Sequence, residues 1–432
     1  MIVRGGTVVT PSGLARAEIA IEGGCIAAVA PDLDEQPDEL DARGLHVFPG
    51  VVDAHVHFDE PGRADWEGIA TGSAAVAAGG GTCFVDMPLN AHPPTLDAPS
   101  FRAKADAAAR ASVTDFALWG GLVPGNGGRL EELADCGVVG FKAFMSPSGI
   151  DDFEAADDAT LREGMARAAG LGLPVAVHAE SPERLVPPAG SGWLDWARSR
   201  PVEAELEAIG KALGFAEEAG CPLHVVHVST AAGVRLVTEA RARGVDATCE
   251  TCPHYLVFCE DDLERLGAAG KCAPPIRPAA EREALWRELV AGTIDLVASD
   301  HSPGPPELKR GDDAFAVWGG ISGCQSLLPA LLTEGPARGL ELPEIARLTA
   351  EAPAARLRLP GKGRLEPGCD ADLAFVDLEA EHRLRAEDLR YRHPLSPYVG
   401  RTFRGSVVRT LVRGGATAGR LVRPSDRLSP AR

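Results

Sequence analysis

Eight short apolar runs recur between residues 51 and 303, and each ends in polar or ionisable residues. They are VVDAHVH (51–57), TCFVDMP (82–88), FALWGGL (116–122), VGFKAF (139–144), PVAVHAE (174–180), LHVVHVS (223–229), VDATCET (245–251) and IDLVASDH (294–301). Such continuous runs are typical of strands buried on both faces of a parallel sheet. Helix-like segments lie between them: one follows a capping-box pattern at Thr160 and Glu163 and ends at Gly170, and another, 202–220, ends at Gly220. Strands alternating with helices in this number predict a (β/α)8 barrel.

The two ends of the chain lie outside these repeats and have a different pattern. Residues 1–50 contain short strand-like runs separated by Gly turns: IVRGGTVVT, AEIAIEGG and CIAAVA. The segment 362–432 is similar, with DADLAFVDL and SVVRTLVRGG. We therefore expect residues 1–50 and 362–432 to pair into one small β domain beside a barrel at 51–361. The final stretch, GRLVRPSDRLSPAR, is predicted to be a loose tail.

Composition restricts the classes of partner. The chain has 62 acidic and 43 basic side chains, a formal net charge of -19. An acidic surface repels phosphate backbones and anionic headgroups, which argues against nucleic acid and membrane partners. The start, MIVRGGTVVT, lacks the pattern of a secretory signal, and no window reaches the ~18 apolar residues of a membrane span. The cysteines lie mostly singly in apolar runs, so we expect reduced thiols and a cytoplasmic protein.

Ionisable side chains gather at the ends of the predicted strands, where barrel enzymes carry their catalytic groups. His55 and His57 close the first run, and their i, i+2 spacing places both on one face of a strand. Further candidates stand near the ends of the fourth, fifth, sixth and eighth runs: Lys142, His178, His227 and Asp300. A single His at such a position is more often structural, but this convergence from several strand ends predicts a metal site.

Imidazole and carboxylate ligands suit zinc and similar divalent ions. Four His and one Asp could hold two ions if an anionic group bridges them. A buried lysine loses its proton more easily, and its neutral amine can capture carbon dioxide as a carbamate, which has carboxylate geometry. We therefore predict two divalent metal ions bridged by carbamylated Lys142. Zn2+ is the first choice, and Co2+, Mn2+ and Fe2+ also fit; a Lys142 ion pair is the alternative.

Other conspicuous residues receive plainer interpretations. His224 precedes His227 by three positions and points elsewhere on a strand, which favours a structural role. Trp119 and Trp318 are interpreted as packing residues.

Several of these strings resemble the cyclic amidohydrolases, a family that includes dihydroorotases, dihydropyrimidinases or hydantoinases, and allantoinases. VVDAHVHFDEPGR resembles the family's entry motif, GFKAFMSPSG its carbamylated-lysine segment, and VHAE, HVVHVS and VASDHSP its other ligand segments. The resemblance covers nearly the whole chain. It implies an α/β fold, a distorted (β/α)8 TIM-like barrel with a small β-sandwich formed by both termini. It also implies metal ligation by the six candidate residues and a homotetramer.

Within the family the chain is most similar to the allantoinase branch, in strings such as EPGRADWEG, SRPVEAE, KCAPPIRP, DHSPGPPELK and YRHPLSPYVGR. Dihydroorotase-like enzymes hold a substrate carboxylate with an Arg two residues after HxH, where this chain has Asp59. An Asp repels a carboxylate but can accept hydrogen bonds from a neutral ureide. Arg63 lies four residues further and could substitute. Hydantoinases place a Tyr five residues after the lysine, where this chain has Pro147.

The expected reaction is therefore the hydrolytic opening of allantoin to allantoate by metal-activated hydroxide, a step of purine nitrogen salvage. Asp300 is the candidate general base, which accepts the hydroxide proton and passes it to the leaving ring nitrogen. Asp59, Asn90 and Ser302 are candidate substrate contacts, chosen by position. A hydantoinase, dihydropyrimidinase or dihydroorotase is the first alternative. A non-catalytic scaffold is the second, and the complete ligand set argues against it.

Overall fold

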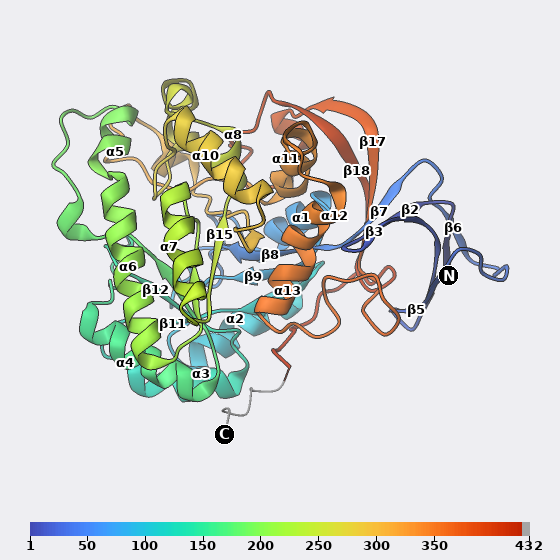
Figure 1. Ribbon diagram of the computed structural model, residues 1–432, viewed down its shortest axis with the longest axis horizontal. Coiled ribbons are helices and arrows are strands. Elements are labelled where there is room, and N and C mark those ends of the chain that lie inside the picture. Colours follow the sequence, from blue (N-terminus) through green and yellow to red (C-terminus); the bar gives the residue numbers. More distant parts are fainter. Residues whose placement is uncertain (426–432) are drawn as a thin grey trace.

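The computed structural model describes residues 1–425, and parallel strands form the barrel at its centre (Figure 1). They are β8 (Val51–Val56), β9 (Gly81–Asp86), β10 (Asp115–Leu118) continued by β11 (Gly120–Gly121), β12 (Phe141–Phe144), β13 (Val175–His178), β14 (Leu223–Val225), β15 (Ala247–Thr251) and β16 (Leu296–Val297). Pairing runs from β8 to β10 and from β11 to β16. A parallel bridge between Val56 and His301 joins the first strand to the segment after the last. Each predicted run contains a strand, so the (β/α)8 prediction is confirmed.

Helices connect the strands and cover the outside of the barrel (Figure 1). They are α1 (Ile69–Ala78), α2 (Ala98–Ala111), α3 (Leu130–Cys136), α4 (Asp158–Leu171), α5 (Trp193–Ser199), α6 (Val202–Ala219), α7 (Ala231–Ala242), α8 (Pro253–Val257), α9 (Leu263–Leu266), α10 (Ala279–Val290), α11 (Leu327–Glu334), α12 (Leu342–Ala346) and α13 (Ala352–Arg356). As predicted, α6 ends at Gly220 in the left-handed conformation. The capping box predicted for α4 is wrong: Asp157 caps the helix by accepting the Thr160 N–H, and Gly172 ends it. A charged acceptor is favoured at this position because it also faces the positive end of the helix dipole.

Strands from the two ends of the chain form two further sheets, ordered β5-β4-β1-β6 and β18-β17-β7-β2-β3. Their bounds are β1 (Ile2–Arg4), β2 (Thr7–Thr10), β3 (Gly13–Arg16), β4 (Glu18–Glu22), β5 (Cys25–Ala30), β6 (Glu39–Asp41), β7 (His46–Pro49), β17 (Leu373–Arg383) and β18 (Thr402–Leu411). The C-terminal strand β17 pairs with β7, so segments far apart in sequence lie side by side (Figure 1). Val3, Ile19, Val47 and Phe375 belong to one apolar cluster that both sheets share. The predicted fold class, a barrel with a small β-rich domain, is confirmed.

A buried ionic cluster connects the barrel to this β-rich part. The Lys362 ammonium lies 2.5 Å from Asp115 of β10, 2.7 Å from Asp372 and 2.9 Å from Asp370. The three carboxylates are close enough to hold a cation. Lys362 already supplies the positive charge, so the cluster is structural, and each buried carboxylate keeps a charged partner.

The segment after β18 packs against the barrel, contrary to the loose tail predicted for it. Leu421 forms a parallel bridge with Phe116, whose N–H donates to the Arg420 carbonyl. Val422 is buried. The end of the predicted tail, residues 426–432, lies outside the described residues. Across residues 1–425, none of the helices combines the length and apolar character needed to span a bilayer.

Candidate metal centre

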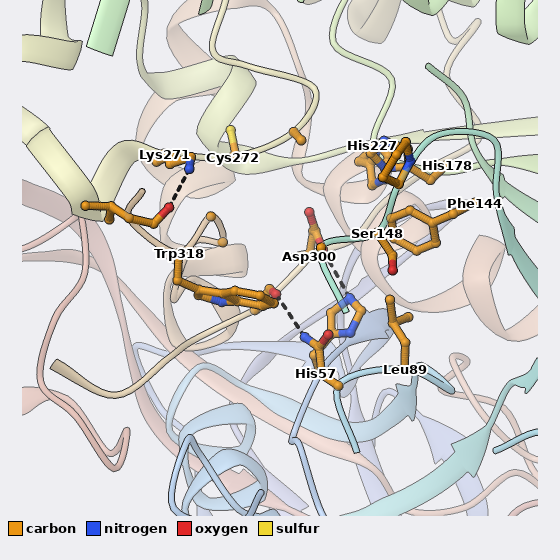
Figure 2. Close-up of a pocket in the computed structure, with 18 of the residues that line it drawn as sticks. His57, Leu89, Phe144, Ser148, His178, His227, Lys271, Cys272, Asp300 and Trp318 are labelled. Carbon is orange, nitrogen blue, oxygen red and sulfur yellow. Dashed lines mark hydrogen bonds and ion pairs between the residues drawn. The ribbon is translucent and has the colours of Figure 1, made fainter. Parts of the chain in front are cut away.

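The carboxyl ends of the barrel strands bring the predicted ligand residues close together. They are His55 in β8, His57 directly after it, Lys142 in β12, His178 at the end of β13, His227 after β14 and Asp300 after β16. All except Lys142 line one cavity of about 370 Å³. Figure 2 shows His57, Asp300, His178 and His227 around it.

His55, His57 and Asp300 form one group of possible ligands. Asp300 Oδ1 lies 3.3 Å from His55 Nε2 and 3.5 Å from His57 Nε2. Burial alone would raise the pKa of Asp300, but the two imidazoles outweigh it and lower this pKa to about 2. Asp300 is thus a carboxylate at neutral pH, which is the form that binds a metal ion or accepts a proton.

His178 and His227 form a second group. His178 Nδ1 lies 3.0 Å from His227 Nε2, and the ring centroids of His227 and His55 are 5.5 Å apart, so the two groups are neighbours. His227 and Asp300 both have a left-handed backbone, with φ of 41° and 46°. That conformation is strained for residues other than glycine, and such strain concentrates at functional sites.

Two buried carboxylates orient these imidazoles. Glu250 Oε1 lies 2.5 Å from His55 Nδ1, and its other oxygen lies 3.0 Å from Nε2 of His224. Glu180 Oε2 lies 2.8 Å from His178 Nε2 and 2.6 Å from the Arg200 guanidinium. A carboxylate on one ring nitrogen fixes the proton there and leaves the other nitrogen free as a metal ligand. The other nitrogens are Nε2 of His55, 3.3 Å from Asp300, and Nδ1 of His178, 3.0 Å from His227, so both face other candidate ligands.

Lys142 is the remaining candidate, and its environment is unusual for a lysine. The side chain is fully buried, and its Nζ has no hydrogen-bond partner within residues 1–425. Nζ lies 4.9 Å from the centroid of the Phe144 ring, which stacks on His178 at 4.5 Å. Burial lowers the pKa of Lys142 to about 7, so a substantial fraction is neutral near that pH. A buried amine with no hydrogen-bond partner in residues 1–425, near His178 and His227, fits the predicted two-ion site.

The candidate substrate contacts are placed differently from one another. Asn90 and Ser302 both line the cavity, and Asn90 Nδ2 lies 3.5 Å from Ser302 Oγ. Asp59 is fully buried and does not line the cavity. Burial, with Asp86 and Glu67 nearby, raises the pKa of Asp59 well above its usual value. Direct contact between Asp59 and a substrate therefore does not fit the structure, because the chain turns it away from the cavity.

Three further residues test the specificity reasoning. Pro147 lines the cavity, as its position after Lys142 suggested. Arg63 does not line it: its guanidinium donates to the Asn90 carbonyl at 2.9 Å and forms an ion pair with Asp152 at 3.3 Å. Trp119 is a packing residue, as predicted, but Trp318 lines the cavity, so that interpretation was wrong.

The sequence profile of the Amidohydrolase family matches residues 46–417. The chain belongs to the amidohydrolase family. This amidohydrolase is 58% identical to an allantoinase from Rubrobacter xylanophilus, with 98% of this chain and 97% of that protein covered. It is 55% identical to an allantoinase from Solibacter usitatus, with 96% and 92% covered. An allantoinase from Escherichia coli is 43% identical, with 96% and 94% covered.

Solved structures give the same family. An L-hydantoinase (dihydropyrimidinase) from Arthrobacter aurescens matches with a TM-score of 0.94 and 35% identity, covering 98% of this chain and 99% of that chain. A dihydropyrimidinase from Brevibacillus agri matches with a TM-score of 0.90 and 31% identity, covering 98% of each chain. The motif resemblance to cyclic amidohydrolases is thereby confirmed.

Glu180 and Glu250 contact the candidate ligands His178 and His55, and neither carboxylate was identified from the sequence. Glu180 stands two residues after His178 in VHAE, a spacing that favours the same face of an extended segment. Glu250 stands inside the apolar run VDATCET, and a carboxylate within a buried strand requires a partner. Both patterns indicate a buried carboxylate that needs a partner, but neither pattern identifies His178 or His55 as that partner. His224 has the structural role predicted for it, with Thr248 and Glu250 as hydrogen-bond partners.

Proposed function

We propose that this amidohydrolase opens the hydantoin ring of allantoin to give allantoate. The observation that carries the proposal is the convergence of four imidazoles and Asp300 on one cavity, in a chain 58% identical over nearly its full length to an allantoinase. Pro147 stands on the cavity where hydantoinases carry a Tyr, which favours allantoin over a simple hydantoin.

We propose that two divalent ions, Zn2+ before Co2+, Mn2+ or Fe2+, bind to His55, His57, His178, His227, Asp300 and a carbamate on Lys142. Bound there, the ions supply an activated water and positive charge for the developing oxyanion. The protein contributes orientation, because Glu250 and Glu180 hold His55 and His178 by their outer nitrogens. The buried amine of Lys142, which has no hydrogen-bond partner among residues 1–425, supports the carbamate.

We assign the proton transfers to Asp300. The water oxygen adds to a ring amide carbonyl while Asp300 accepts its proton, and Asp300 then donates that proton to the ring nitrogen as the C–N bond breaks. The carboxylate is charged before the reaction and lines the cavity, so it is available as an acceptor. Asn90 and Ser302, which face the same cavity, are the proposed contacts to the ring amide.

The test is parallel hydrolysis of allantoin, 5-substituted hydantoins, dihydrouracil and dihydroorotate by purified, metal-loaded enzyme. Strong preference for allantoin, measured as kcat/KM, is the expected result. Preference for a hydantoin or dihydrouracil would overturn the proposed substrate and leave the metal centre intact. Metal content measured on the same sample tests the two-ion proposal separately.

We also propose a cytoplasmic homotetramer. The motif resemblance supports the tetramer, and ten cysteines without a disulfide support a reducing compartment. Light scattering of the eluted protein should give four times the 45.1 kDa chain mass. A monomer mass at assay concentration would refute this assembly.

A further inference from the structure

Segment 308–320 forms one wall of the cavity. Leu308, Phe315, Val317, Trp318 and Gly320 line it from this segment. Figure 2 shows Trp318 and Lys271 on one side of the cavity and His178, His227 and Phe144 on the other. A ring whose reacting carbonyl is at the metal centre would therefore present its far side to this wall.

Outside a short 3-10 turn at Pro306–Lys309, this wall has no helix or strand of its own, so hydrogen bonds must fix its shape. A hydrogen bond joins the two ends of the wall, because the backbone N–H of Trp318 donates to the Leu308 carbonyl at 2.8 Å. The Gly320 N–H donates to the Lys271 carbonyl at 2.7 Å. The Ala314 N–H donates to the Ser191 carbonyl at 2.8 Å and so links the wall to the segment before α5.

Two lysine side chains complete these attachments. Lys309 Nζ donates to the Gly320 carbonyl at 2.5 Å and lies 3.5 Å from the Ala268 carbonyl. Lys271 Nζ donates to the Val317 carbonyl and lies 4.0 Å from the centroid of the Trp196 ring. Trp196 in turn meets Phe315 of the wall edge-on at 5.5 Å.

Burying the Lys309 ammonium carries an unfavourable desolvation free energy. Its side chain is buried, and within residues 1–425 its hydrogen-bond partners are backbone carbonyls. Removing an ammonium from water without a carboxylate partner is unfavourable. Burial and the neighbouring Lys271 lower the pKa of Lys309 to about 7, in agreement with this cost. We therefore expect the hydrogen bonds of Lys309 to offset this desolvation by stabilising a specific backbone conformation of the wall.

The position of Gly320 indicates which part of the wall Lys309 stabilises. Gly320 has φ of 127°, and a Cβ there would lie 2.0 Å from the Ser302 carbonyl oxygen. The Gly320 backbone is thus packed directly on Ser302, which lines the cavity. The Lys309 ammonium holds the Gly320 carbonyl, and the backbone carbonyl of Lys271 accepts the Gly320 N–H. The Lys271 ammonium holds the Val317 carbonyl, so the two ammonium groups fix neighbouring parts of the wall beside Ser302.

We propose that Lys309 and Lys271 are positioning residues that hold segment 308–320 as a rigid wall, and that this wall determines which ring substituents the cavity accepts. The inference rests on the proposed function only for the identity of the substrate. The wall admits a cyclic amide whose ring substituent fits between Trp318 and the metal centre. Within residues 1–425 neither ammonium forms a hydrogen bond or ion pair with a candidate metal ligand, so we expect metal content to survive the loss of these wall contacts.

The test compares Lys309→Met with Lys309→Arg and with Lys211→Met, a control on the outer face of α6. Met has a similar length but cannot donate, and it leaves the partly buried Gly320 carbonyl without its ammonium partner. Hydrogen exchange of peptides covering 308–320 is measured on metal-free protein. We expect exchange to rise about tenfold in Lys309→Met and less in Lys309→Arg, with Lys211→Met unchanged.

Kinetics give the second readout. With full metal content, Lys309→Met should raise KM about tenfold while kcat changes by less than about threefold, and the ratio of kcat/KM between two differently substituted rings should shift. Unchanged exchange and unchanged KM would overturn the proposal, as would a loss of kcat alone. If Lys309→Met does not fold, Lys309→Arg and Lys271→Arg decide by the same criteria. Hydrogen exchange is measured without substrate, so its result does not depend on whether allantoin is the substrate. The wall proposal and the proposed function can therefore fail separately.

Discussion

Replacing Glu250 by Gln tests whether one buried carboxylate orients the metal ligands. Glu250 lies 2.5 Å from His55 Nδ1 and 3.0 Å from His224 Nε2, and it is 1% exposed. Gln has nearly the same shape but one carbonyl oxygen, so its NH2 must face one of the two imidazoles. The oxygen that faces His55 also accepts the His227 backbone N–H at 3.3 Å, so the Gln oxygen should stay beside His55 and the NH2 should face His224. The Nδ1–H of His55 then donates to a neutral amide instead of a carboxylate, which makes Nε2 a less basic metal ligand.

The size of the effect follows from these contacts. Carboxylates that orient a metal-binding His contribute about 10–100-fold to metal affinity or activity. That range corresponds to about 1.4–2.7 kcal/mol. Glu250 also accepts the backbone N–H of His227 at 3.3 Å, so two candidate ligands lose a charged partner. We therefore expect a value at the upper end, a loss of about 100-fold in metal affinity.

The assay is bound metal after dialysis against a series of buffered free-zinc concentrations, followed by kcat/KM at each loading. Asp295→Asn is the matched control, because Asp295 accepts the Cys249 N–H at 2.8 Å and pairs with Arg241 without touching a candidate ligand. The control should lose stability and keep its metal affinity. Wild-type affinity and activity in Glu250→Gln would refute the reasoning that the charge of this carboxylate strengthens His55 as a metal ligand.

Three shorter predictions follow from the same structure. Lys142→Ala should lose metal and activity together, with partial rescue by acetate, and a fully active, metal-loaded variant would contradict the carbamate bridge. Asp300→Asn should lower turnover by about 10²–10⁴-fold in a sample of known metal content, and unchanged turnover would exclude Asp300 as the base. Lys362→Met should lower the free energy of unfolding in urea by about 3–5 kcal/mol, because it leaves buried carboxylates unpaired. Arg404→Met, which breaks the exposed pair with Glu381, should cost about 0–1 kcal/mol, and equal losses in the two variants would argue against the buried cluster.

The barrel could be predicted from sequence because its strands are buried on both faces. Each strand then appears as an unbroken apolar run, and the alternation with helices leaves few other topologies. The cap of α4 could not be predicted with the same security, because Asp157 and Thr160 are both good N-cap residues. The segment around Leu421 was misjudged for a different reason. Its attachment is a bridge to Phe116, a contact hundreds of residues away that leaves no local pattern.

The metal centre shows the same division between local and long-range information. Side chains at strand ends must meet in a barrel, so the candidate ligands could be named from their positions. Asp59 was named as a substrate contact from the resemblance to dihydroorotase-like enzymes, and a position in a motif does not show which way the side chain turns. The strand ends at Val56, and Asp59 then adopts φ of 62°, which turns the chain and buries the side chain. Trp318 was interpreted as a packing residue because its segment has no periodic pattern that would indicate a side chain facing a cavity.

For Glu250, the sequence predicts that a partner is needed but does not predict which residue that partner is. A carboxylate inside an apolar run cannot be solvated, so the sequence alone requires a cationic or hydrogen-bonding partner for it. The sequence does not give the partner, because His55 is 195 residues away and meets Glu250 only when the barrel closes. The same closure brings Asp300 beside His55. The orientation of the candidate ligands therefore depends on the closed barrel. We expect a substitution that disrupts the bridge between β8 and the segment after β16 to weaken metal binding even when every ligand residue is still present.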